Sequence, residues 1–567
     1  MQLTKSFPLA IMACLVALVC LAQGAANPPA ASTQKTCQVR QSSLSPGDLA
    51  MSHDDYTKAI DLYKIESKAA GPEGERAHAA LVRALLAANR LKEAEDEAKA
   101  WVAASPNDPW SGVALGEVQW RQGYLTDAAK NLQDVSKKDP CNPQIHVDIA
   151  RFYRFSDMMA AAKQEMEAAH TLDPVDDDIA GRWMQMQPRS IQLAELTKYL
   201  DRATFLSDNE RKSLERRKTR LTQPPAEPCR LANAVQSTTI PYRGLQNGPN
   251  APISWGLNVS FDGKERRMEI DTGADGLTLT KAAAAALHLV PETHFQVGGV
   301  GDQGSVDATV AKVKSIKIGN LEFQNCDVQV LGSDTVEVVG GDGTLHPVKR
   351  LGDLDGLIGG DVFKDFILTL DFPGHVLKLD PLPAIPGAAT NVASLDTGAA
   401  EAADDAPLQN RYVDPSMKDW TKVYSVGSKL IVPVHLNDGP IRLFIVDTGA
   451  SSDLISPQAA REVTHVSNGT EDDYFGVSGQ VKKTFTTDEL TLSFAGLRKL
   501  TQGMTAIDMS SSTRYAGIDI SGFLGAPTLH QLTVRIDYRD RLVGFSYDPK
   551  RIVRCVQTET GNVGECF

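Results

Sequence analysis

The stretch FIVDTGASSDLIS, residues 444–456, decides the fold that we expect for this chain. An apolar run ends at Asp447, a small polar residue and a glycine follow, and the chain then becomes apolar again. The earlier stretch MEIDTGADGLTLT, residues 268–280, repeats this order with Asp271 in the same place. A carboxylate at the end of a buried strand is costly unless it is needed there. The repetition therefore predicts two related segments, each of which presents one aspartate.

The motifs that follow each stretch come in the same order. A short helix-like segment is followed by a glycine-rich segment, an apolar pair with a glycine, and a hairpin with an aspartate at its corner. Corresponding positions are similarly spaced: the two motif aspartates differ by 176 (447 − 271), while Leu357 and Phe523, like Asp371 and Asp537, differ by 166 (523 − 357 and 537 − 371). β-branched, alternating stretches between glycines predict mostly β structure. We expect a first lobe at 229–386, a linker at 387–420, a second lobe at 421–550 and a tail at 551–567.

Each of these segments resembles a lobe of the pepsin and retropepsin family of aspartic peptidases, and most closely its bacterial retropepsin-like members. Asp-Thr-Gly-Ala-Asp at 271–275 is the form that retroviral proteases carry. The resemblance implies a pseudo-dimer of two lobes, with Asp271 and Asp447 as the catalytic pair at an approximate two-fold axis. It implies active-site loop support from Thr272, Gly273, Ala274, Thr448, Gly449 and Ala450, with the threonine hydroxyls joining the two loops. It also implies substrate or flap contacts from Asp275, Ser451, Gly299, Gly301, Tyr474 and Gly476.

The chemistry explains why the motif needs two carboxyl groups. Hydrolysis of an amide needs a base that takes a proton from water and an acid that gives one to the substrate. Two close carboxylates do not both ionise easily, so they share a proton, and their titration belongs to the pair. No cofactor is implied, and no zinc motif or Cys/His cluster suggests a metal ion.

Competing interpretations explain less of the pattern. A hairpin turn with a capping aspartate accounts for one motif but not for the duplicated order. A third Asp-Thr-Gly, at Asp396, lies in the predicted linker and follows no apolar strand, so we interpret it as accidental. Residues 299–304 match G-x-G-x-x-G, but no helix follows, so we predict a flap hairpin rather than a dinucleotide site.

The N-terminal third contains a repeat of a different kind. Prolines stand at positions 72, 106, 140 and 174. Each step (106 − 72, 140 − 106, 174 − 140) is 34 residues, which is the length of one tetratricopeptide repeat. Residues 45–185 therefore resemble degenerate tetratricopeptide repeats in an α-solenoid, with a generic array of helical hairpins as the alternative. Such stacks offer a groove to a protein partner. Residues 186–228 predict a charged helical linker that ends at a proline-rich stretch.

Residues 1–26 predict a secretory signal peptide, with a lipoprotein anchor as the alternative, and hence an exported, periplasmic or secreted protein. No later stretch predicts a transmembrane segment. The net charge of −13 argues against binding to nucleic acid. Six cysteines follow the predicted signal peptide, and their pairing is open, although Cys555 and Cys566 could close a loop.

The sequence as a whole predicts a multidomain protein, namely an exported aspartic endopeptidase that acts on a peptide or protein substrate. Its repeats would recruit a partner or substrate. The alternative is a non-catalytic peptide-binding or scaffold protein built from degenerate protease lobes. A further variant pairs each lobe with its counterpart in another chain.

Overall fold

The computed structural model describes residues 3–5, 37–40, 43–202, 206, 208–223, 229–233, 237–246, 253–300, 305–339, 344–352, 354–386, 394–395, 408–468, 474–476, 478–481, 483–551, 555–557 and 563–566. The chain forms two compact units. The helical unit comprises residues 9–225 and 403–410, and the mostly-β unit comprises residues 1–8, 226–402 and 411–567. In the described part of the chain, no helix has both the length and the apolar character that a membrane span requires.

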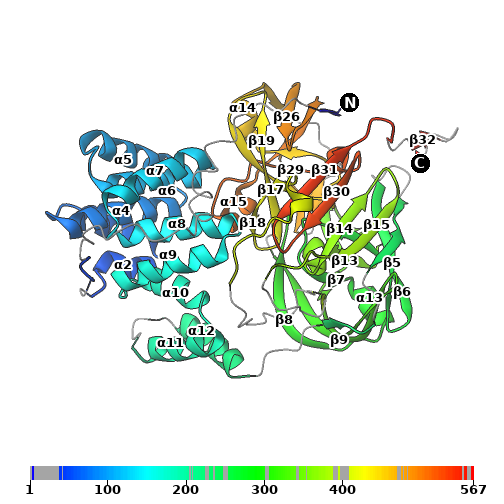
Figure 1. Ribbon diagram of the computed structural model, residues 1–567, viewed down its shortest axis with the longest axis horizontal. Coiled ribbons are helices and arrows are strands. Elements are labelled where there is room, and N and C mark those ends of the chain that lie inside the picture. The colour runs from blue at the N-terminus through cyan, green and yellow to red at the C-terminus, as the bar shows by residue number, and fades with distance from the viewer. Residues whose placement is uncertain are drawn as a thin grey trace. The chain divides into compact units, whose positions relative to one another are not determined.

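The helical unit is a series of antiparallel helix pairs (Figure 1). The first helices of three successive pairs begin at Pro109, Pro143 and Asp177, so the two intervals (143 − 109 and 177 − 143) are equal and match the spacing of the prolines. Their bounds, in chain order, are α2 (Pro46–Ser52), α3 (Tyr56–Glu66), α4 (Pro72–Ala87), α5 (Leu91–Ala104), α6 (Pro109–Arg121), α7 (Leu125–Lys138), α8 (Pro143–Phe155), α9 (Met159–Leu172), α10 (Asp177–Gln185), α11 (Arg189–Arg202) and α12 (Asp208–Thr222).

Small residues and prolines set the spacing of these helices. A Cβ atom on Gly116 of α6 would lie 3.6 Å from Leu132 of α7, which is ordinary packing distance, and Gly123 takes a φ of 77° in the turn between them. Proline starts α4, α6 and α8, where the missing N–H costs nothing. Pro72 is the first residue of α4, whereas Pro106 lies in the turn before α6, so the evenly spaced prolines do not all occupy equivalent places.

A segment from the predicted linker at 387–420 packs on this helical unit. The Met159 N–H donates to the Gln409 carbonyl at 3.1 Å, and the Ala161 N–H donates to Asn410 Oδ1 at 3.0 Å. Asn410 thus caps the first turn of α9, whose own preceding residue provides no side-chain cap. A disulfide between Cys37 and Cys141 also lies within the unit.

The mostly-β unit contains two large sheets, one from each half of its sequence. The first half supplies β2 (Cys229–Leu231), β4 (Arg243–Gln246), β5 (Ile253–Phe261), β6 (Lys264–Asp271), β7 (Leu277–Leu279), β8 (Pro291–Gly298), β9 (Ser305–Ile318), β10 (Leu321–Leu331), β13 (Gly356–Gly359) and β16 (Ser394–Leu395). The second half supplies β18 (Tyr424–Val426), β19 (Lys429–Leu436), β20 (Ile441–Val446), β21 (Leu454–Ile455), β22 (Val466–Asn468), β25 (Thr484–Thr487), β26 (Leu490–Phe494), β27 (Leu497–Thr501), β28 (Thr505–Ile507) and β29 (Gly522–Leu524), and β1 (Leu3–Lys5) pairs with β27. Shorter elements are the helices α13 (Lys281–Ala286), α14 (Pro457–Arg461), α15 (Ser510–Ala516) and α16 (Ala526–Leu529), and the hairpins β11 (Thr335–Val339)–β12 (Leu345–Lys349), β23 (Tyr474–Gly476)–β24 (Gly479–Val481) and β32 (Cys555–Gln557)–β33 (Val563–Cys566).

A third sheet takes strands from both halves. Its order is β17 (Thr421–Lys422), β31 (Leu542–Tyr547), β30 (Leu532–Asp537), β14 (Phe366–Asp371), β15 (Val376–Pro381) and β3 (Thr238–Pro241). At its centre β14 and β30 are antiparallel, with Ile367 opposite Asp537 and Asp371 opposite Thr533. Residues 371 and 537 are the last residues of equivalent strands. The two halves therefore contribute the same strand to this sheet, and the two copies pair in antiparallel orientation.

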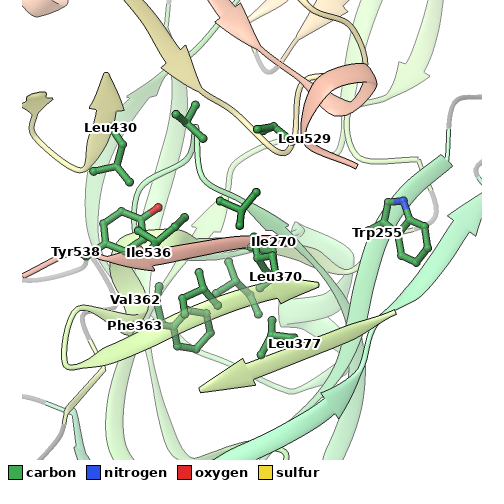
Figure 2. Close-up of a cluster of buried hydrophobic side chains, with 14 of the residues drawn as sticks. Trp255, Ile270, Val362, Phe363, Leu370, Leu377, Leu430, Leu529, Ile536 and Tyr538 are labelled. Carbon is green, nitrogen blue, oxygen red and sulfur yellow. The ribbon is translucent and has the colours of Figure 1, made fainter. Parts of the chain in front are cut away.

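One hydrophobic core extends through both halves. Ile270, Phe363 and Leu370 come from the first half, and Leu430, Leu529 and Ile536 come from the second (Figure 2). Each of these side chains is buried. Ile270 immediately precedes Asp271, so the strand that carries this aspartate is fixed by the shared core. The disulfide between Cys229 and Cys326 links β2 to β10 in the first half.

Candidate active site

The two predicted aspartates are placed by equivalent strands. Asp271 ends β6, which is parallel to β13, and Gly359 lies opposite it in the register. Asp447 follows β20, which is parallel to β29, and its N–H donates to the Leu524 carbonyl at 3.0 Å. A buried apolar residue, Ile270 or Val446, immediately precedes each aspartate, and both aspartates are half-buried. The apolar-apolar-Gly segments named from the sequence are thus the strands beside the two aspartate-bearing strands.

The threonines of the two motifs bond across the interface between the halves. The Thr272 N–H donates to Thr448 Oγ1 at 3.0 Å, and the Thr448 N–H donates to Thr272 Oγ1, also at 3.0 Å. The Thr272 hydroxyl donates to the Val446 carbonyl at 2.8 Å, and the Thr448 hydroxyl donates to the Ile270 carbonyl at 2.7 Å. Both threonines are buried. Four hydrogen bonds therefore fix the two loops against each other.

The glycines of the two motifs bring the backbone against the opposite aspartate. A Cβ atom on Gly273 would lie 2.5 Å from Asp447 Cγ, and a Cβ atom on Gly449 would lie 2.5 Å from Asp271 Cγ. Real Cβ contacts are not that short. Glycine is thus the residue that allows the two carboxyl groups to approach one another.

Each carboxyl group also accepts hydrogen bonds from its own loop. Asp271 Oδ1 accepts from the Gly273 N–H at 2.8 Å. Asp447 Oδ1 accepts from the N–H groups of Gly449 and Ala450, both at 3.0 Å. Ala274 is held in its loop by a backbone bond, in which its N–H donates to the Asp271 carbonyl at 3.0 Å.

The two aspartates differ in their electrostatic surroundings. Burial raises the pKa of Asp271 above its usual value, and the Lys429 ammonium and a hydrogen bond with Asp447 act against that rise. Burial and the neighbouring Asp271 raise the pKa of Asp447 well above its usual value. Two carboxyl groups that share a site hold one proton between them over a wide pH range.

The predicted flap segments form two hairpins. β8 and β9 lead to a tip at residues 299–304, of which Gly299 and Val300 are described and Gly301 lies outside the described residues. β23 and β24 form the other hairpin, with Gly476 at the end of β23; of Tyr474 only the backbone is described. The Ser478 N–H donates to the Val300 carbonyl at 3.0 Å, so the hairpin tips of the two halves are in contact.

The two residues that follow the motifs have different roles. Asp275 pairs with Lys429 Nζ at 2.8 Å and accepts a hydrogen bond from the Ser428 hydroxyl. Ser451, at the equivalent position of the second motif, is exposed. Sequence reasoning named Asp275 but missed Lys429, because a lysine so distant along the chain (429 − 275 = 154) has no local signal that links the two. The third Asp-Thr-Gly, at Asp396, lies outside the described residues.

A buried ionic cluster in the second half was also missed. Lys499 Nζ lies 2.5 Å from Asp453 Oδ2 and 2.7 Å from Thr528 Oγ1, and the lysine is completely buried. The Gly525 N–H donates to Asp453 Oδ1 at 2.8 Å. Asp453 thus supports the glycine that follows β29, the strand beside Asp447. The equivalent residue in the first half is Leu277, which also follows its aspartate by six positions in the sequence (453 − 447 = 277 − 271 = 6).

The site consists of paired Asp-Thr-Gly loops on a mostly-β scaffold, and the same chain carries helical repeats. Together these two features define the class of protein. Residues 257–362 match the family of aspartyl proteases, and residues 46–109 match the tetratricopeptide repeat. The chain therefore combines a tetratricopeptide-repeat region with an aspartyl protease domain. The protease match includes Asp271 but ends before the second motif.

No curated protein matches the chain. Among solved structures, a thermophilic tetratricopeptide-repeat protein from Thermus thermophilus is 20% identical, with 31% of this chain and 95% of that chain covered and a TM-score of 0.23.

Proposed function

We propose that this chain is an aspartic endopeptidase in which Asp271 and Asp447 activate one water molecule. The observation that carries the proposal is the reciprocal contact of the two motifs. Each threonine bonds to the other motif, and each glycine lies against the other aspartate. An aspartate that only capped a turn would need neither contact. The matching register of β14 and β30 supports a pseudo-dimer of two lobes within one chain.

The proposed reaction uses both carboxyl groups in different protonation states. The ionised carboxylate takes a proton from the water, whose oxygen attacks the carbonyl carbon of the peptide bond. The protonated carboxyl gives its proton to the carbonyl oxygen, which yields a tetrahedral diol. The diol then collapses, the C–N bond breaks, and a proton passes to the leaving nitrogen, so that a carboxylic acid and an amine are formed.

Substitution of either aspartate tests the proposal. Asp271→Asn and Asp447→Asn should each remove nearly all hydrolysis of a peptide library between pH 3 and pH 8, and the double variant should be little worse, because the pair acts as a unit. Asp396→Asn is the matched control, since it changes the third Asp-Thr-Gly, and it should keep full activity. If the wild type cleaves nothing at any pH, or if Asp447→Asn cleaves normally, the non-catalytic peptide-binding function replaces this one.

The other parts of the chain suggest where and on what the enzyme works. The N-terminal sequence favours export, and the two disulfides suit an oxidising compartment such as the periplasm or the cell exterior. Tetratricopeptide repeats favour interaction with a protein, so we propose that the helical unit recruits a partner or substrate. Detection of the protein in a periplasmic or extracellular fraction, with its disulfides formed, tests the first of these points.

A further inference from the structure

The loop that follows Asp271 carries an ion pair with a residue from the other half. Lys429 is the first residue of β19 in the second half, and its Nζ lies 2.8 Å from Asp275 Oδ1 in the first half. The lysine side chain is 15% exposed, so water screens its charge only partly. Asp275 follows Asp271 closely in the chain (275 − 271 = 4), which brings the ion pair to the loop of that aspartate.

The equivalent positions on the other side carry no charge. In the first half Gly256 pairs with Glu269, which is two residues before Asp271. In the second half Ile431 pairs with Ile445, which is two residues before Asp447. Lys429, two residues before Ile431, therefore corresponds to Ser254, two residues before Gly256. Asp275 corresponds to Ser451. The two halves thus agree in the motif itself and differ in the charge beside it.

The effect of Lys429 on the two aspartates is unequal. After burial, Lys429 has the largest influence on the pKa of Asp271, and it lowers that pKa. For Asp447, burial, Asp271 and hydrogen bonds all have larger effects on the pKa than Lys429.

We propose that Lys429 holds the negative charge of the pair on Asp271, so that Asp271 takes the proton of the water and Asp447 donates to the carbonyl oxygen. This inference rests on the proposed function. Lys429 is a positioning residue, since it acts through Asp271 and Asp275.

Other titratable groups around the pair do not provide the same asymmetry. They come from the elements that surround the two loops and are Tyr242, Glu269, Asp361, Tyr515, Tyr538 and Arg541. Burial raises the pKa of each of the three tyrosines, so all three are neutral in the working range. Glu269 and Asp361 carry no positive charge in either protonation state, so neither stabilises a negative charge on Asp271. Arg541 acts on Tyr538, and its guanidinium lies 6.0 Å from the centre of that ring.

Two substitutions of one ion pair separate an electrostatic role from a structural one. Lys429→Met removes the cation, so ionisation of Asp271 becomes harder, and the acidic limb of the kcat/KM profile should move up by about one pH unit. Asp275→Asn leaves the cation uncompensated, so the same limb should move down. Lys429→Arg keeps the charge and should restore the wild-type limb. Lys312→Met is the matched control, because it breaks an exposed pair with Asp327 and should move nothing.

A purely structural role predicts a different result. Both substitutions break the same contact between the halves, so both would lower activity or stability together and leave the limb in place, and that outcome would overturn the inference. Titration of the carboxyl groups by NMR of ¹³Cγ-labelled aspartate, assigned with Asp271→Asn and Asp447→Asn, gives the order of ionisation without any turnover. If Asp447 ionises before Asp271, the inference is wrong even in an active enzyme. If Asp271 ionises first in a protein that cleaves nothing, Lys429 still holds the negative charge on Asp271, but the proposed function fails and the two catalytic roles fail with it.

Discussion

Glycine at the third position of each motif places the backbone of one half against the carboxyl group of the other. The space for a Cβ atom on Gly449 is already occupied by the Asp271 carboxyl, at 2.5 Å from Cγ. The carboxyl group is itself fixed by the Gly273 N–H at 2.8 Å, so it cannot move aside without losing that bond. At the scale of single residues, the approach of the two aspartates thus depends on the two glycines, which have no side chain.

Gly449→Ala is therefore expected to displace Asp271 and to lower kcat/KM by at least 100-fold, with a loss of about 1–3 kcal/mol of unfolding free energy from overpacking. Peptide hydrolysis and chemical denaturation measure the two effects. Gly181→Ala is the control, since no atom lies within 4 Å of its Cβ position in α10, and it should keep activity. Normal activity in Gly449→Ala would show that the carboxyl groups need not approach closely.

At the scale of elements, the second half differs from the first by a buried charge under its active-site loop. Lys499 from β27, Asp453 before β21 and Thr528 from α16 form one hydrogen-bonded cluster. Burial lowers the pKa of Lys499, while Asp453 raises it, so the pair compensates a charge that would otherwise be isolated. A buried ion pair of this kind contributes little net stability but is costly to break on one side.

Lys499→Met should cost about 3–5 kcal/mol of unfolding free energy, because the Asp453 carboxylate remains buried without its cation. Asp453→Leu added to it should recover at least half of the loss, since the first half already has Leu277 at the equivalent position. Denaturant unfolding measures both variants. Lys378→Met breaks an exposed pair with Asp380 and should change stability by less than about 0.5 kcal/mol. A double variant no more stable than Lys499→Met alone would contradict this account.

At the scale of the whole molecule, each compact unit contains its own disulfide. Cys37–Cys141 closes a separation of 104 residues in the helical unit, and Cys229–Cys326 closes 97 residues in the mostly-β unit. A disulfide that closes a loop of this length reduces the entropy of the unfolded chain. In this view each disulfide stabilises the folded protein by on the order of 4 kcal/mol.

The two disulfides should therefore stabilise different thermal transitions of the full-length protein. Replacement of Cys229 and Cys326 by serine should lower the melting temperature of the mostly-β unit and leave the helical transition in place. Replacement of Cys37 and Cys141 should do the reverse. Differential scanning calorimetry, with far-UV circular dichroism to identify the helical transition, measures both. A joint shift of both transitions in either variant would show that the units unfold as one.

The sequence by itself determined the features that depend on neighbours along the chain. An apolar strand that ends in Asp-Thr-Gly identified the aspartyl protease domain, and the regular spacing of prolines identified the tetratricopeptide repeats; the family matches confirm both. The order of a helical repeat region and a mostly-β region is likewise confirmed. These signals are local because strand burial, turn glycines and helix starts are fixed by residues a few positions apart.

Only the tertiary structure decided which distant residues meet. It brought Lys429 to Asp275, paired Cys37 with Cys141 and Cys229 with Cys326, and placed Asn410 on α9 across 249 positions of sequence. Lysine, cysteine and asparagine occur at many positions that make no such contact, and no period relates the partners. The sequence thus specified two aspartates of the same kind, whereas the charge that distinguishes them follows from how the two halves pack.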